Sequence, residues 1–372
     1  MDEHSGHEAE RRVSTLELFF DLVFVFAITQ LTAVLADDPT VLGAFRVLLI
    51  FGVLWWMFGG YVWLTNAVAP DRPMRKLLLL AAMAGFLVIA LAIPTAFDAG
   101  GGLVFGIGFL FVVLIHSGLY LRAQKGSSII GMLRVAPLNI VAAFVLIGAS
   151  FLDGPMVYAL WVLALGIAVA ISFLVDPRGF TINAGHFVER HGLLLIIVLG
   201  ESIVAISVGA ADLPLDASLL VAGTLALAVV SCLWWLYFSE DDARAEEAIS
   251  AASSERGIRI ALNAYFYAQI PMLLGVVAFA AGVKSAIGHA FEPLAPYAAL
   301  FLAAGVALYV VGDALFRMGI GFGHANARLV GALAALATFP VGLVSASLQL
   351  ATLLAVLLAA VLIRPRRAIV PS

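Results

Sequence analysis

The sequence predicts an all-α polytopic membrane protein with about twelve transmembrane helices. Of the 372 residues, 63% are hydrophobic and 12% are charged, whereas about a quarter of the residues in a soluble domain are charged. The apolar runs are long and show no alternation of period two, which favours helices over a β-barrel as the spanning elements. Lys and Arg, finally, gather in alternate connecting segments. These three observations exclude a water-soluble globule.

A spanning helix needs about 20 mostly apolar residues, and interruptions by polar residues, Gly or Pro separate the candidate spans. Asp153-Gly154-Pro155 is a clear turn between the fifth and sixth spans, whereas Ser345-Ala346-Ser347 is a weak boundary between the last two. The expected spans cover residues 14–36, 42–66, 75–95, 103–123, 133–152, 155–175, 190–210, 217–238, 257–283, 295–317, 325–345 and 347–364.

The basic residues orient these spans, because Lys and Arg near a span are retained on the cytoplasmic side. With the amino terminus inside, 18 of the 20 basic residues fall on the inner side, and only Arg46 and Lys284 fall outside. The outer connections carry acidic residues instead. Met1 to Arg12 lack the apolar core of a cleaved signal peptide. We therefore expect an integral protein of the cytoplasmic membrane with both termini in the cytoplasm.

Composition also excludes several partners. A net charge of −4 provides no basic field for the phosphates of a nucleic acid. Cys232 is the single cysteine, so neither an intrachain disulfide nor a thiolate metal cage is expected. We predict no cofactor and no metal, and take the lipid bilayer and a small solute or cation as partners. Homo-oligomerisation is left open.

The two halves of the chain resemble each other. Trp55-Trp56 and Trp234-Trp235 lie 179 residues apart, and Asp21 matches Glu201 at an offset of 180. This spacing predicts two parallel six-helix repeats, residues 1–180 and residues 181–372, related by an axis along the membrane normal. The alternative is that tryptophans simply anchor helices at the membrane interface.

Asp21 and Glu201 are the main candidates for function, since an acidic residue within a span costs roughly 2.5–3.5 kcal/mol on insertion scales. As repeat-related carboxylates, they would face one another or a shared cavity and bind a cation or carry protons. The alternative is a structural role, in which each carboxylate is neutral or pairs with Arg11, Arg190 or another inner arginine.

Further polar residues within the spans are weaker candidates. Glu17 lies one turn before Asp21, but Ser14-Thr15-Leu16-Glu17 also has the spacing of a capping box, and Glu17 is near enough to the boundary to be solvated. Asn263 and Tyr267, four residues apart, would line a polar pathway or form hydrogen bonds between helices. The predicted substrate- or ion-binding residues are Asp21, Glu201, Glu17, Asp313, His116, Asn263 and Tyr267.

The segment from His186 to His191 is the densest cluster of ligand-type side chains. His186 and Glu189 are three residues apart and would share one face of a helix. Two ligands do not make a metal site, and a solvated inner segment that places Arg190 near lipid headgroups is the favoured interpretation.

Several segments together resemble the bacterial low temperature requirement protein A family. They are 16–25 (LELFFDLVFV), 186–192 (HFVERHG), 199–203 (LGESI) and 234–238 (WWLYF). The resemblance implies a polytopic protein of the bacterial inner membrane and no established substrate. Residues Asp21, Glu189, Arg190, His191, Glu201 and Tyr237 occupy its motif positions, and the pairs Trp55-Trp56 and Trp234-Trp235 support them. The first span also resembles a potassium-channel family with a Phe-Ser-Asp motif, although Phe20 replaces the serine here.

We therefore expect a transporter of an unknown solute, coupled to protons or cations through intramembrane carboxylates, and not an enzyme. A cation channel, a noncatalytic assembly protein and a lipid-modifying enzyme centred on His186, Glu189 and His191 are the alternatives.

Overall fold

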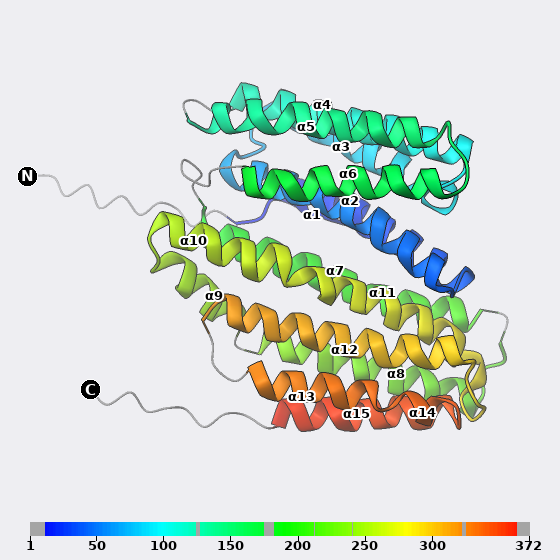
Figure 1. Cartoon of the computed structure of the whole chain (residues 1–372). Helices are drawn as coiled ribbons and strands as arrows, with labels where there is room; N and C mark the ends of the chain where they lie inside the picture. The colour runs from blue at the N-terminus through cyan, green and yellow to red at the C-terminus, as the bar shows by residue number, and fades with distance from the viewer. Residues whose placement is uncertain are drawn as a thin grey trace, which may run out of the picture. The chain divides into compact units, whose positions relative to one another are not determined.

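The computed structural model describes residues 12–123, 127–174, 182–211, 213–239, 241–321 and 325–362, and within these ranges every regular element is helical (Figure 1). The elements are α1 (Thr15–Asp37), α2 (Val41–Ala67), α3 (Pro73–Ala92), η1 (Ile93–Thr95), α4 (Ala99–Ala123), α5 (Ser127–Ala149), α6 (Pro155–Leu174), α7 (Ala184–Gly209), α8 (Ala217–Phe238), α9 (Asp241–Ser250), α10 (Ser254–Ala261), η2 (Leu262–Tyr267), α11 (Gln269–Ala286), η3 (Ile287–His289), α12 (Pro296–Gly319), α13 (Ala325–Leu336), α14 (Phe339–Gly342) and α15 (Ala346–Leu362).

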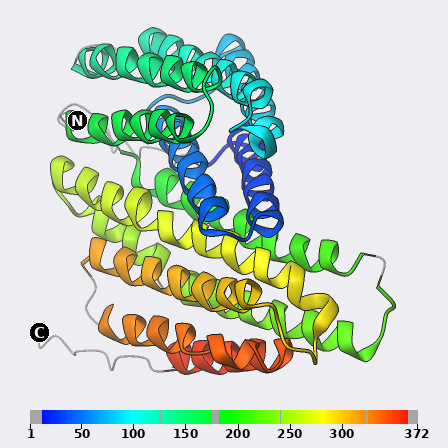
Figure 2. The ribbon, with the colours of Figure 1, turned by 45° about the vertical axis from the view of Figure 1, so that its right-hand side comes forward.

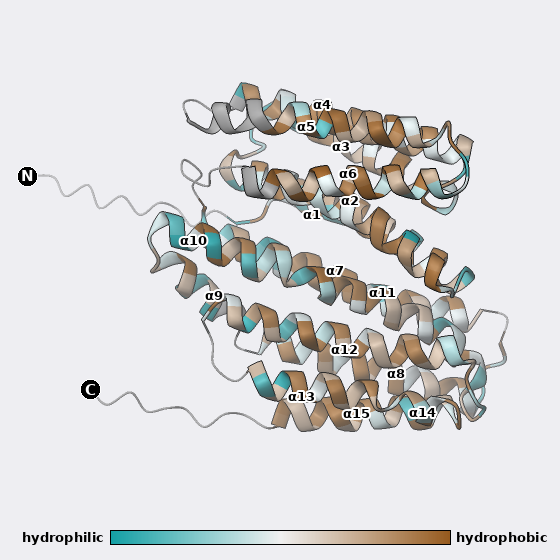
Figure 3. Ribbon diagram, viewed as in Figure 1, coloured by the Kyte–Doolittle hydropathy of each residue, from teal (hydrophilic) through white to brown (hydrophobic). Residues whose placement is uncertain are grey.

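In the described residues, nine helical segments are long and apolar enough to cross a bilayer, and hydrophobic residues dominate their lengths (Figure 3). They are α1, α2, α3 with η1, α4, α7, α8, the stretch Ser254–His289, α12, and α13 with α14. Shorter apolar stretches at 135–149, 155–171 and 346–362 occupy the positions of the other three expected spans. This architecture is that of a polytopic helical membrane protein, as the composition predicts.

Several helices extend beyond the expected spans, and α5 and α7 each begin six residues before them. Helix α7 begins at Ala184, six residues before the expected span, because the Asn183 side chain caps it by accepting a hydrogen bond from the His186 N–H (3.0 Å). The acidic stretch after α8 forms helix α9. The expected turn at Asp153-Gly154-Pro155 is confirmed, with Gly154 at a φ of 66°.

The chain divides into two compact units. Unit 1 comprises residues 1–34, 41–194 and 249–259, and unit 2 comprises 35–40, 195–248 and 260–372. In unit 1, α3 packs on α4, α4 on α5, and α5 on α6, while α6 also contacts α2 (Figure 2). An aromatic cluster fills the unit beside α1, where the rings of Phe24 and Phe58 stack at 4.0 Å and that of Phe20 lies 5.0 Å from Tyr61.

In unit 2, α11 packs on α12, α12 on α13, and α15 on both α13 and α8. Glycines at every seventh position of α12, Gly305, Gly312 and Gly319, face the backbone of the preceding span. A Cβ at Gly305 would lie 2.5 Å from the amide nitrogen of Phe279. Small residues permit such close approach of helices in lipid, and a period of seven is typical of a left-handed crossing.

The span expected at 257–283 is interrupted by a π-helical turn, η2, between α10 and α11. Such turns widen a helix and leave backbone carbonyls displaced from the regular ladder. Asn263 and Tyr267 lie in this turn, and both are exposed on unit 2. The expected span is therefore irregular at Asn263 and Tyr267.

Candidate functional site

A cluster of buried charged residues lies in unit 1, where α1, α2 and the first turns of α7 meet. Glu17 contributes from the start of α1. Its Oε2 atom accepts hydrogen bonds from the Ser14 N–H (2.9 Å) and hydroxyl (2.7 Å), while the Glu17 N–H donates to Ser14 Oγ (3.3 Å). This is the predicted capping box. The prediction that Glu17 is solvated is wrong, because none of the residue is exposed.

The other oxygen of Glu17 faces α7. Oε1 lies 3.1 Å from His186 Nε2 and 3.4 Å from Arg190 Nη1. Both partners are buried, His186 completely and Arg190 to within 1%. The capping carboxylate therefore also joins α1 to α7, and the interpretation of His186 and Arg190 as part of a solvated segment near lipid headgroups is wrong.

Asp21, one turn further along α1, shares the same arginine. Arg190 Nη2 donates to Asp21 Oδ1 (2.9 Å), and Nη1 donates to the hydroxyl of Thr65 on α2. The guanidinium also lies over the ring of Phe20, with 5.9 Å from Cζ to the centroid. Asp21 Oδ2 is buried and has no hydrogen-bond partner among the described residues. Asp21 is thus held through Oδ1, while Oδ2 is bare, that is, buried without a hydrogen bond from the described residues.

The tautomer of His186 follows from Asn66 on α2. The Asn66 amide pairs with the backbone of Asn183, because its Nδ2 donates to the carbonyl (3.0 Å) and its Oδ1 accepts from the N–H (3.1 Å). This pairing fixes which end of the amide faces His186. Nδ2 is the end that lies 3.1 Å from His186 Nδ1, so Nδ1 accepts. The neutral ring then carries its proton on Nε2, which faces Glu17.

The charges within this cluster do not cancel. Glu17 and Asp21 bring two carboxylates, Arg190 brings one guanidinium, and the tautomer set by Asn66 makes His186 neutral. A buried charge without a counter-charge is costly. The bare Oδ2 of Asp21 is the place where one further positive charge, the smallest being a proton, would balance the cluster.

The family described as bacterial low temperature requirement A protein (LtrA) matches residues 12–363. The chain belongs to this family. A relative in Rhizobium meliloti (strain 1021), described as "Uncharacterized protein RA0937", is 28% identical over 297 residues, which cover 76% of this chain and 71% of the relative. All four residues of the charged cluster lie within the matched family range.

The other predicted site residues of this LtrA protein lie elsewhere. Glu201 is buried on the part of α7 that belongs to unit 2. Asp313 is buried on α12, where its Oδ2 lies 2.8 Å from Arg328 Nε and 3.9 Å from Arg317 Nε. His116 is buried on α4 of unit 1, with its ring centroid 5.0 Å from that of Tyr61. Of the seven predicted binding residues, the structure brings together Glu17 and Asp21.

The LtrA motif positions divide between the cluster and other contacts. Glu189 is exposed and accepts a hydrogen bond from the Val13 N–H (3.0 Å), so it does not share a partner with His186. His191 is buried, with Nδ1 2.8 Å from the Phe187 carbonyl oxygen. Tyr237 is buried beside Phe316, with 5.1 Å between the ring centroids.

The two tryptophan pairs of this LtrA chain have different surroundings. Trp55 is buried in the middle of α2, and Trp56 Nε1 donates to Asn139 Oδ1 (3.0 Å). Trp234 and Trp235 near the end of α8 are 42% and 49% exposed. Interfacial anchoring fits the second pair and is excluded for Trp55.

Sequence reasoning missed Thr65, Asn66 and Asn183. Thr65-Asn66 near the end of an otherwise apolar span was one available signal, and Asn183 was another, since Asn is a preferred N-cap residue. Placing the start of α7 at Asn183 would have put His186 and Arg190 on one helical face.

Proposed function

We propose that this LtrA protein is a proton-coupled transporter of a small solute in the bacterial cytoplasmic membrane, with Asp21 as its proton-binding residue. The observation that supports the proposal is the buried excess of one carboxylate over guanidinium, with Asp21 Oδ2 bare. Ionisable residues at membrane depth commonly mark proton relays and ion pathways. A proton needs a single lone pair, whereas a metal cation needs several oxygen ligands.

Proton uptake would alter the contact between α1 and α7. With Asp21 ionised, Arg190 is shared between Asp21 through Nη2 and Glu17 through Nη1. A proton on Asp21 Oδ2 neutralises that carboxyl group, and Arg190 and Glu17 then balance each other. The attraction between Asp21 and Arg190 weakens, so the protonated and ionised states favour different arrangements of α1 against α7. A transporter couples a proton to a solute through two such states.

The two units share the same order of helix packing. Contacts run α3, α4, α5, α6 and back to α2 in unit 1, and α11, α12, α13, α15 and back to α8 in unit 2. This common order supports two parallel six-helix repeats, residues 1–180 and 181–372, with Glu201 as the counterpart of Asp21. We further propose that both termini lie in the cytoplasm and that the activity is not enzymatic.

The test is proton flux into proteoliposomes that contain a pH-sensitive dye, driven by a potassium diffusion potential. Flux is measured with and without a small-metabolite extract outside, because a coupled transporter requires its solute whereas a channel does not. We expect wild type to show saturable, extract-dependent flux, and Asp21→Asn and Glu201→Gln to lose most of it. Asp153→Asn, a matched change in an exposed turn, should behave as wild type.

Size-exclusion profiles and melting temperatures of the reconstituted variants separate loss of transport from loss of folding. Wild-type flux that equals the flux into empty liposomes, with or without extract, would contradict the proposal. Flux that is linear in voltage and indifferent to the extract would indicate a cation channel instead.

A further inference from the structure

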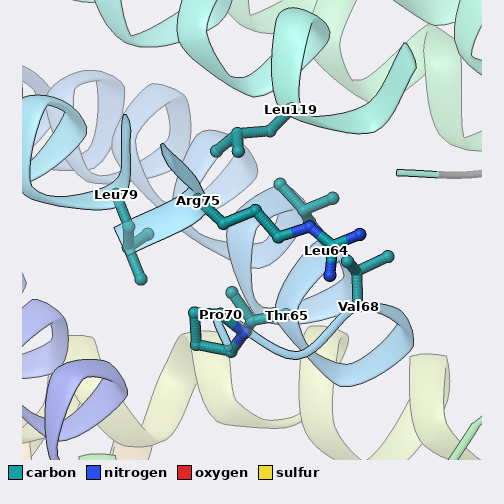
Figure 4. A pocket seen from close by; sticks show the side chains of 7 residues that line it. All are labelled: Leu64, Thr65, Val68, Pro70, Arg75, Leu79 and Leu119. Carbon is teal, nitrogen blue, oxygen red and sulfur yellow. The ribbon is translucent and has the colours of Figure 1, made fainter. Parts of the chain in front are cut away.

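A small recess opens in unit 1 where α2 ends and α3 begins (Figure 4). Its apolar wall consists of Leu64, Val68, Leu79 and Leu119, and its polar lining groups belong to Thr65 and Arg75. The cavity volume is about 20 Å³. A cavity of roughly 10–15 Å³ holds one water molecule, so this recess has room for a water molecule.

Thr65 connects the recess with the charged cluster. Its side chain lines the recess, and its hydroxyl accepts the hydrogen bond from Arg190 Nη1 while donating to the Tyr61 carbonyl (3.1 Å). Arg190 in turn binds Asp21. One hydroxyl group therefore separates a water-sized recess from the proposed proton-binding pair.

A buried histidine, His116, lies between the same two helices. His116 lies one turn before Leu119 on α4, and Gly60 lies one turn before Leu64 on α2, so both are one helical turn deeper than the recess. A Cβ at Gly60 would be 3.2 Å from His116 Nε2, which shows how closely the α2 backbone approaches the ring. His116 is 4% exposed.

The imidazole of His116 is satisfied only in part by the protein around it. The backbone of Gly60 approaches the ring at Nε2, and Nδ1 has no hydrogen-bond partner among the described residues. A neutral imidazole has one donor and one acceptor to satisfy. Buried polar groups without protein partners are commonly bonded to ordered water.

We propose that water enters unit 1 through this recess and forms a single file of water molecules between α2 and α4 as far as His116. Thr65 links this water file to Arg190 and Asp21. The proton-carrying role of the file rests on the proposed function, whereas its hydration does not. The Arg75 end of the recess belongs to a connection predicted to lie in the cytoplasm, so the file is the cytoplasmic route of the proton. In this arrangement Thr65 positions the last water before the guanidinium.

Thiol labelling tests the entrance. In a Cys232→Ala background, the full-length protein carries either Leu119→Cys in the recess wall or Leu114→Cys on the same helix, where the native side chain is 50% exposed on the outer surface of the unit. The probe is silver ion in chloride-free buffer, applied to reconstituted protein. Thiols react as thiolates, which form in water and not in lipid, so Leu119→Cys should react about tenfold faster or more.

Adding Val68→Trp to Leu119→Cys should fill the recess and reduce the rate to that of Leu114→Cys. Val68 is only half-buried, so this change leaves the packed core intact. Equal rates for Leu119→Cys and Leu114→Cys, in protein with a wild-type melting temperature, would overturn the proposed entrance.

Water-edited solid-state NMR tests the inner end. In protein with ¹⁵N-labelled histidine, the ring signal that disappears in His116→Phe should gain polarisation from water as fast as that of His289, which is exposed. A build-up as slow as that of core amides would show a dry histidine and overturn the file. Both measurements are independent of transport. A hydrated file in a protein without proton flux would refute the proposed function alone, and proton flux through a dry interface would refute this route alone.

Discussion

Arg190 Nη2 lies 2.9 Å from Asp21 Oδ1, although the two residues are 169 positions apart in the sequence. The contact joins the first helix to the first turns of the seventh. It places a charged pair in the interior of unit 1, together with Glu17 and the hydroxyl of Thr65. Arg190 therefore supports both the fold of unit 1 and the chemistry proposed for Asp21.

Replacing Arg190 should destabilise the protein strongly. Arg190→Leu leaves Glu17 and Asp21 as buried carboxylates without a guanidinium, and breaking one side of a buried ion pair costs about 3–5 kcal/mol. We expect a large fall in melting temperature in detergent. Adding Asp21→Asn removes one of the uncompensated charges and should recover part of the fall. A double variant no more stable than Arg190→Leu would contradict the pairing.

Asn66→Asp should change the protonation of the His186 ring. The new carboxylate cannot donate to Nδ1 and accepts a hydrogen bond there, while Glu17 still faces Nε2, so the ring is expected to carry a proton on both nitrogens. The ¹⁵N shifts of the His186 ring report this change directly. Asn139→Asp, which alters the partner of Trp56 instead, is the matched control and should leave the His186 signal unchanged.

The contact between α11 and α12 should be intolerant of one added methyl group. Gly305→Ala places a Cβ 2.5 Å from the Phe279 amide nitrogen and 2.7 Å from the Gly275 carbonyl oxygen, and overpacking of this kind costs about 1–3 kcal/mol. Gly118→Ala on α4 meets nothing within 4 Å. It should be neutral or stabilising by up to about 1 kcal/mol, since Ala is the better helix former. The melting temperature should therefore fall in Gly305→Ala and stay the same or rise in Gly118→Ala.

Asp313 should depend more on Arg328 than on Arg317. Arg328 Nε is 2.8 Å from Asp313 Oδ2 and its side chain is 9% exposed, whereas Arg317 Nε is 3.9 Å away and its side chain is 16% exposed. The closer, more buried partner contributes more to stability. Arg328→Gln should therefore lower the melting temperature by more than Arg317→Gln, and the reverse order would show that Arg317 is the main partner.

Single cysteines in a Cys232→Ala background should establish the orientation. Asp153 and Asp71 are both exposed and lie in connections predicted on opposite sides of the membrane. An impermeant maleimide applied to intact cells is expected to label Asp153→Cys, and to label Asp71→Cys only after the cells are opened. Labelling of Asp71→Cys in intact cells would reverse the predicted topology.

Much of the fold follows from local sequence patterns. The helices begin and end within a few residues of the expected spans because apolar length and loop polarity are local properties. The capping box of Ser14 and Glu17 follows from spacing alone. Helix α7 is one exception, since its first six residues are polar enough to resemble a loop. The burial of His186 among them depends on partners from α1 and α2 that no local pattern reveals.

The site was predictable in part for the same reason. Asp21 stands out because a carboxylate inside an apolar run is expensive, and Arg190 was among its considered partners. Thr65 and Asn66 do not stand out, because a hydroxyl and an amide near a helix end are common and inexpensive. Their roles come from tertiary contacts with Arg190 and His186. Whether Glu201 shares a cavity with Asp21 stays a prediction.

The position of Arg190 and His186 in the chain also has a consequence for biosynthesis. When α1 leaves the ribosome, its two acids have no counter-charge, and the guanidinium of Arg190 that supplies it is translated about 170 residues later. A nascent chain that stops after α6 therefore has a complete first helix without the arginine that pairs with its acids. A chain extended to residue 194 carries every member of the charged cluster. Maturation of the amino-terminal portion thus awaits the beginning of the second half, which ties the two halves together during synthesis.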